Sequence, residues 1–168
     1  MPVFCLLAGC GFHPIYGARD DNSSVAAELN QVAVENIPDR PGQMLRNGLI
    51  DRMYGKGRPR NPKYHLEISL NWTEEGIGLL PDATTSLTEL NLNADYYLKD
   101  DTGKVLMHAV AHAVANYNQL EEQLGTVAAR DNAYQRSLNM IANEIVIRLG
   151  LFFSEGAALP KPKPAPPP

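Results

Sequence analysis

Cysteine is nearly absent from this chain of 168 residues, which contains only Cys5 and Cys10. Two cysteines supply neither a disulfide framework nor a four-cysteine zinc site. Long apolar runs are missing too: no segment after the N-terminal stretch approaches the roughly 18 unbroken apolar residues that span a bilayer. The hydrophobic content of 44% is nevertheless sufficient for a core. The sequence therefore predicts one compact domain.

Clustered positive charge is also lacking. The formal net charge is −4 and the isoelectric point is about 5.5. Binding to nucleic acid requires groups of Lys and Arg that neutralise phosphates, and no basic stripe occurs here. We therefore expect no nucleic-acid partner.

The motifs of common enzyme classes are absent as well. The chain has no GxSxG elbow, Walker loop, GxGxxG or HExxH sequence. Its adjacent acidic pairs, Glu74 with Glu75 and Asp100 with Asp101, point to different sides or lie in turns. We interpret them as solvated acids and not as an acid–base dyad. The sequence predicts neither catalysis nor a cofactor.

His108 and His112 have a spacing that suits a metal ion when both lie on one helix. On a strand, four rises of about 3.3 Å separate such residues by roughly 13 Å, too far to share an ion. The DDTG turn before them and the NYN after them favour a strand. We expect two exposed histidines and no metal site.

Residues 7–10 read Leu-Ala-Gly-Cys after an apolar stretch, which is the lipobox of bacterial lipoproteins. The thiol of Cys10 would receive a diacylglycerol, and cleavage would leave it as the first residue. Each buried CH₂ contributes about 0.8 kcal/mol, so two or three acyl chains hold a protein on a membrane. The charged region that begins a signal peptide is missing here. A buried structural cysteine and a reactive thiol are the alternatives.

Hydrophobic periodicity predicts the order strand, helix, three strands, helix. The strands are expected at 31–37, 64–73, 90–99 and 104–118, and the helices at 39–55 and 126–153. Asp39 and Thr126 are the expected helix caps. Residues 74–82 are expected to form a turn, and 100–103 a hairpin turn. In the last helix the apolar face comprises Tyr134, Leu138, Ile141, Ile145, Leu149 and Phe152.

This order indicates an α+β fold, a two-layer sandwich with a four-stranded, mostly antiparallel sheet and two helices packed on one face. The expected organisation has four parts. Residues 1–9 are the remainder of a signal peptide, and residues 10–30 are a lipidated N-terminus and extended tether. Residues 31–153 form the domain. Residues 154–168 are a proline-rich tail.

Several segments in this order resemble the LptE family of lipopolysaccharide-assembly lipoproteins, also called RlpB. They are the lipobox followed by GFHPIYG, the run VENIPDRPGQMLRNGL, the hairpin pair of strands, and VAARDNAYQRSLNMIANEIVIRL in the last helix. The resemblance covers roughly residues 7–153. It depends on the order and spacing of the segments, because no single one of them is decisive.

The resemblance implies an acylated protein on the periplasmic side of the outer membrane. Members of the family lie inside the β-barrel LptD, help it fold, and help deliver lipopolysaccharide to the outer leaflet. They also bind lipopolysaccharide, and a basic residue before Asp-Asn in the last helix is implicated. Arg130 occupies that position in AARDN. Its guanidinium can pair bidentately with a phosphate of lipid A.

One difference from the family pattern concerns a second basic residue, which members can carry between the second and third strands. From Tyr64 to Leu98 this chain has no Lys or Arg. Direct binding would therefore depend on Arg130 or on other cations. The alternative interpretation of Arg130 is a surface arginine in the first turn of the last helix.

The residues themselves also suit a plug or adaptor, because a small domain with a polar sheet surface matches the polar lumen of a barrel. A lipid-anchored periplasmic adaptor of another envelope lipid-transport system is the alternative function. An anchored enzyme is the third possibility, and the absence of a nucleophile, base and metal set argues against it.

Overall fold

The computed structural model describes residues 20–55, 57–79, 85–119 and 123–158. Within these ranges the chain forms three helices and four strands. They are α1 (Asp20–Leu29), β1 (Val32–Val34), α2 (Asp39–Met53), β2 (Tyr64–Leu79), β3 (Thr85–Asp100), β4 (Val105–Asn118) and α3 (Gln123–Ala158). The predicted α+β class and the order from β1 to α3 are confirmed. None of the described helices is long and apolar enough to cross a membrane.

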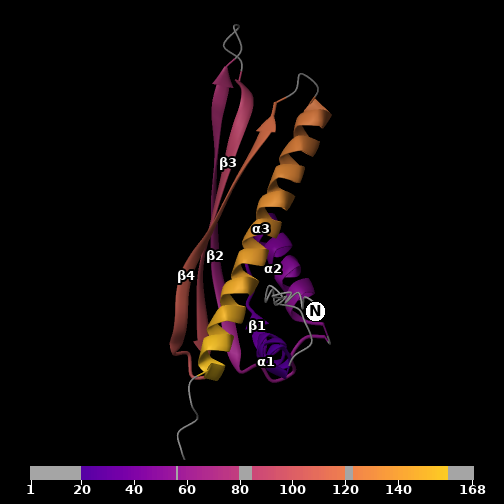
Figure 1. The fold of residues 1–168 in the computed structure, drawn as a ribbon. Helices are drawn as coiled ribbons and strands as arrows, with labels where there is room; N and C mark the ends of the chain where they lie inside the picture. Colours follow the sequence, from indigo (N-terminus) through magenta and orange to yellow (C-terminus); the bar gives the residue numbers. More distant parts are fainter. Residues whose placement is uncertain (1–19, 56, 80–84, 120–122, 159–168) are drawn as a thin grey trace, which may run out of the picture.

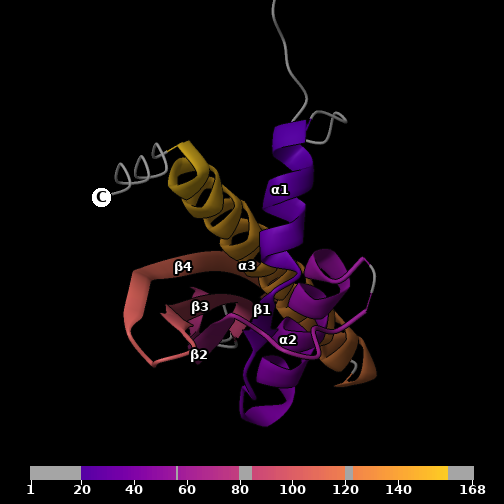
Figure 2. The same cartoon turned by 90° about the horizontal axis from the view of Figure 1, so that it is seen from below.

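The four strands form one sheet in the order β1-β2-β3-β4. β1 runs parallel to β2, with α2 as the connection between them, and the other two pairs are antiparallel. Figure 1 shows an elongated, twisted sheet with α3 beside it for nearly its whole length. The view along the long axis in Figure 2 shows the helices gathered on one side of the strands.

One face of the sheet is apolar, as the alternation predicted. Leu66 and Ile68 of β2 point inward, and five inward residues of β3 have no exposed surface. These five are Leu90, Leu92, Ala94, Tyr96 and Leu98. α3 packs its own apolar stripe against this face, mainly over β4. The core therefore lies between the sheet and α3, and α2 extends it beside β1.

α3 differs from the prediction at both ends. It begins at Gln123, so Thr126 lies inside the helix and is not its cap. At the other end Phe153 is buried, and Phe152, which the sequence placed on the apolar face, is only partly buried. The other predicted core residues of α3 are buried as expected. An ideal period of 3.6 residues drifts over so long a helix, which explains the shift by one residue at its end.

α2 buries Leu45, Leu49 and Met53 as predicted, but its cap differs. Pro38 precedes the helix in an extended conformation and makes no side-chain capping bond. Asp39 is the first helical residue and has a positive φ of 64°. The predicted cap at Asp39 is therefore wrong.

Three further boundaries differ. The expected extended tether is helical over α1, whose Val25 and Leu29 pack against the core. The expected turn at 74–82 is strand as far as Leu79, because β2 continues into a longer hairpin with β3. β1 has only the three residues Val32–Val34, whereas the sequence predicted a strand over residues 31–37. The hairpin turn is confirmed, with Gly103 at φ 85°.

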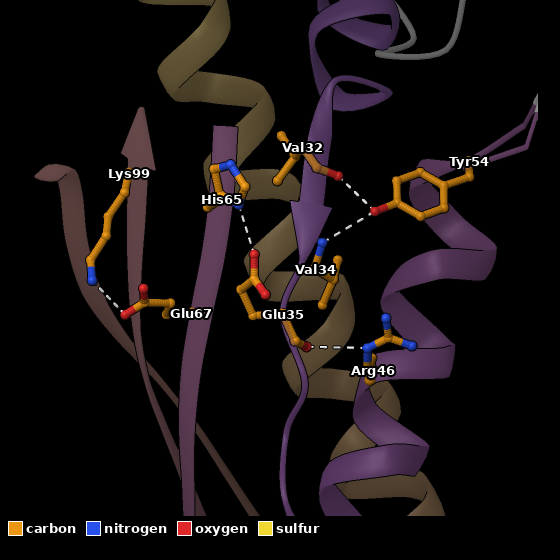
Figure 3. A network of polar contacts seen from close by, with 8 residues as sticks. All are labelled: Val32, Val34, Glu35, Arg46, Tyr54, His65, Glu67 and Lys99. Atoms are coloured by element: carbon orange, nitrogen blue, oxygen red, sulfur yellow. Dashed lines mark hydrogen bonds and ion pairs between the residues drawn. The ribbon is translucent and has the colours of Figure 1, made fainter. Parts of the chain in front are cut away.

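Side chains bond to some of the backbone groups at both outer edges of the sheet. On β1, the hydroxyl of Tyr54 donates to the carbonyl of Val32 at 2.6 Å and accepts from the amide of Val34 at 3.2 Å (Figure 3). The guanidinium of Arg46 donates to the carbonyl of Glu35 in the same region (Figure 3).

On β4, α3 supplies the corresponding contacts. Arg148 donates to the carbonyl of Val110 at 3.2 Å, and Arg136 donates to the carbonyl of Asn116 at 3.5 Å. An uncovered edge strand offers a row of backbone groups for pairing with another chain. These contacts reduce that tendency at each edge.

Gly42 marks the closest approach of α2 to the chain before it. A Cβ built there would lie 2.6 Å from Cγ2 of Ile37 and 3.1 Å from its backbone carbonyl carbon. We therefore expect Gly42→Ala to lower the free energy of unfolding by about 1–3 kcal/mol, measured by urea denaturation. Gly48→Ala is the matched control, since its Cβ would lie 3.2 Å from Nη1 at the end of the Arg52 side chain and 3.8 Å from Cβ of Ala142, and would meet no backbone atom this closely. Helix propensity should make that variant as stable as the wild type or more so. Equal stability of the Gly42 and Gly48 variants would contradict the steric explanation.

Candidate functional site

The most concentrated group of polar contacts in the described core surrounds Glu74, at the end of the core nearest the β2–β3 hairpin. The Nε of Arg130 donates to both carboxylate oxygens at 3.1 Å, and its Nη2 donates to Oε1 at 2.6 Å. Tyr117 donates to Oε2 at 2.6 Å and Tyr134 donates to Oε1 at 2.7 Å. The Glu74 side chain is 21% exposed. We call these four residues the Glu74 cluster.

Three elements meet in this cluster, because Glu74 lies on β2, Tyr117 on β4, and Arg130 and Tyr134 on α3. Trp72 packs beside it, with its ring edge-on to the ring of Tyr134 at a centroid distance of 6.4 Å. The carboxylate therefore links α3 to two strands of the sheet at a point where the apolar core ends.

The pKa of the Glu74 carboxyl reflects two opposing effects. Burial alone would raise this pKa, but hydrogen bonds from Arg130, Tyr117 and Tyr134 outweigh burial and lower the pKa below its ordinary value. The hydrogen bond to Glu74 raises the pKa of the Arg130 guanidinium. Burial, followed by the bond to Glu74, raises the pKa of Tyr134. The cluster thus favours an ionised carboxylate, a charged guanidinium and neutral phenols.

Arg130 retains a free edge despite this pairing. Glu74 takes the edge formed by Nε and Nη2, and Nη1 has no hydrogen-bond partner among the described residues. The side chain is 51% exposed, and its guanidinium carbon lies 5.5 Å from the centre of the Tyr134 ring. Arg130 is about two turns into α3 and not in the first turn. It can therefore meet an external anion with the edge that Glu74 leaves open.

The interpretation of Glu74 as a solvated acid was wrong. The inward residues of β2 are even-numbered from Tyr64 to Trp72, and Glu74 continues that series. The alternation of inward and outward residues along β2 therefore already indicated that Glu74 points toward the core. It was missed because the predicted strand ended at residue 73, which removed Glu74 from the pattern. Glu75 is exposed on the opposite face, as expected.

The face of the sheet that points away from the helices is mostly polar, and none of the described helices packs on it. Asn71, Asn93 and His112 lie in one row across β2, β3 and β4, and all three are exposed. Neighbouring rows contain Ser69, Thr73, Asn91 and Asp95 beside the half-exposed Val110 and Val114. Hydroxyl and amide groups thus dominate the middle of this face, which we call the open sheet face.

The family model of lipopolysaccharide-assembly proteins, LptE, matches residues 29–149, which include every residue of the Glu74 cluster. The chain belongs to the LptE family. No curated protein sequence matches the chain.

Solved structures support the fold of this LptE-family chain. A putative lipoprotein from Caulobacter crescentus is 18% identical with a TM-score of 0.66, and the alignment covers 79% of this chain and 97% of that one. The rare lipoprotein B from Shewanella oneidensis is 12% identical with a TM-score of 0.56, covering 77% and 97%. A minor lipoprotein from Acinetobacter baumannii is 16% identical with a TM-score of 0.57, covering 79% and 96%.

His108 and His112 of this LptE-family chain lie on β4, so the predicted strand is confirmed. His108 contacts Asp95 at 2.8 Å and stacks on Tyr97 with the ring centres 4.3 Å apart. No group of three or more His, Cys, Asp or Glu that could hold a metal occurs among the described residues. Cys10, the predicted lipidation site, lies outside the described residues, as do residues 1–9 and 159–168.

The lowered pKa of Glu74 makes stability depend on pH in a defined direction. A depressed pKa contributes stability that is complete above the unfolded value of 4.5 and is lost as pH falls through the lower folded value. We expect Glu74→Gln to reduce the free energy of unfolding by about 1–3 kcal/mol at pH 7. The difference from wild type should shrink below pH 4.5, as measured by urea denaturation across pH 3–7. Glu75→Gln is the matched control, and a similar loss there would argue against the cluster as the cause.

Proposed function

We propose that this chain is an outer-membrane lipoprotein that plugs and helps to assemble an LptD-type β-barrel, and that it assists lipopolysaccharide transport to the outer leaflet. Membership of the LptE family is the observation that carries the proposal. The role is non-catalytic and requires no cofactor or metal. The acyl chains on Cys10 anchor the protein to the membrane on its periplasmic side.

The shape of the domain supports the plug. The open sheet face offers amide, hydroxyl and imidazole groups from Asn71, Asn93 and His112 over three strands. The lumen of an outer-membrane barrel is polar, so such a face can exchange bonds with water for bonds with the barrel wall. Tyr54 and Arg148 occupy backbone groups at the two sheet edges, which favours contact with the barrel through side chains.

Isolation of the native protein tests the barrel partner. The tagged full chain is extracted from its own envelope in mild detergent, and the proteins that accompany it are identified by mass spectrometry. We expect a large outer-membrane β-barrel in near-equal amount and a fatty-acylated Cys10. The Cys10→Ala variant should leave the membrane fraction. Recovery with an inner-membrane lipid-transport complex would support the adaptor alternative, and recovery of the chain alone would contradict the plug.

Arg130 is the proposed contact for a lipopolysaccharide phosphate. Its Nη1, which has no hydrogen-bond partner in the described part of the chain, and its exposed side chain support this role. A hydrogen bond to a charged group contributes about 1.5–3 kcal/mol, so Arg130→Gln should weaken lipopolysaccharide binding roughly tenfold or more. Binding is measured by titration of purified lipopolysaccharide and of its dephosphorylated form.

Arg58→Gln is the control for this experiment, because Arg58 is an exposed arginine in the segment between α2 and β2. It removes the same charge and should leave binding unchanged. Arg130→Gln should have no effect on the dephosphorylated ligand. Unchanged binding of the phosphorylated ligand by Arg130→Gln would remove Arg130 from the site.

A further inference from the structure

Arg130 is not an isolated cation, because its guanidinium is already paired with an internal carboxylate. Glu74 contacts Nε and Nη2 at 2.6–3.1 Å and is itself held by the hydroxyls of Tyr117 and Tyr134. The two charges offset each other, so the pair is neutral. An anion that approaches Nη1 therefore meets a cation and, a few ångströms behind it, a fixed negative charge.

We propose that Glu74 sets the affinity of Arg130 for phosphate: it fixes the guanidinium with one edge free and weakens the attraction of that edge for an anion. The inference rests on the proposed role of Arg130 and extends it to a second residue. In the bound state the phosphate accepts from the Nη1 edge while Glu74 keeps the other edge. Glu74 is thus a positioning residue that does not touch the ligand.

The geometry favours this arrangement over displacement of Glu74. The carboxylate accepts bonds from three side chains on two elements, and the phenols of Tyr117 and Tyr134 lose their acceptor if it leaves. An incoming phosphate would have to replace all of these bonds. The open edge of Arg130 requires no such exchange, since Nη1 has no partner among the described residues.

Weak attraction suits a protein that passes its ligand onward. A site that holds a phosphate with an unopposed arginine binds more tightly and releases more slowly, since changes in affinity appear mostly in the dissociation rate. With Glu74 on the Nε and Nη2 edge, Arg130 binds a phosphate through its fixed Nη1 edge and retains it briefly.

Removal of the Glu74 charge tests the inference. We expect Glu74→Gln to bind lipopolysaccharide about three- to tenfold more tightly at low salt, and the gain to decline as salt screens the charge. The gain should be absent from Glu74→Gln combined with Arg130→Gln. Glu75→Gln carries the same charge change on the opposite face of β2 and should bind as the wild type does. Glu74→Met, which fills the space with an apolar side chain, should show the same gain and serves if the glutamine variant folds poorly.

The outcomes separate the two proposals. Equal or weaker binding by folded Glu74→Gln or Glu74→Met overturns the role of Glu74, even if Arg130→Gln loses binding. Unchanged binding by Arg130→Gln overturns the proposed site itself.

A measurement on the native chain tests the bound geometry without any substitution. The Nε–H resonance of Arg130 reports its hydrogen bond to Glu74 and can be followed by NMR during titration with inorganic phosphate. We expect this resonance to keep its position while binding saturates, because Glu74 stays in place. A shift of the Nε–H resonance toward that of a solvated arginine would show displacement and would overturn the arrangement.

Discussion

The contact between α3 and the apolar face of the sheet is the constraint on which the other features depend. α3 has 36 residues and is about 54 Å long, while β2 and β3 have 16 residues each and extend about 53 Å. One helix is thus about as long as the strands and lies beside them for nearly their whole length (Figure 1). Ile141, Ile145 and Leu149 are fully buried along this contact. All described helices lie on this side, and the opposite face of the sheet has no covering element among the described residues.

Glu74 lies where this apolar contact ends and a polar surface begins. A carboxylate at such a position is costly unless its oxygens are bonded, and here Arg130, Tyr117 and Tyr134 bond both of them. The result is a fixed guanidinium at the rim of the core. An unpaired arginine side chain on the surface of a helix samples several rotamers, so the ion pair that offsets the charge of Arg130 also gives its guanidinium a defined direction.

Alternation and helical spacing were sufficient to predict the sheet, α2 and α3, because burial on one face leaves a period in the sequence. These patterns were insufficient to predict α1 and the Glu74 cluster, because both depend on contacts between residues that are distant in the sequence. α1 is polar in sequence and was interpreted as a tether, yet Val25 and Leu29 give it enough apolar contact to pack. Arg130 came from the family resemblance. Its partner Glu74 is remote in sequence, and only the folded β2 and α3 bring the two together.

Side-chain bonds to the edge strands have a particular value for a domain proposed to sit within a barrel. Every strand of a barrel is already paired, but during assembly its strands are temporarily open. A plug with free edges would compete for those strands and trap the barrel in a mispaired state. Tyr54 occupies the amide and carbonyl groups of β1, and Arg148 and Arg136 occupy two carbonyls of β4. The sheet can then support a barrel through the side chains of its open face, while these edge groups of its backbone are less available for pairing with a barrel strand.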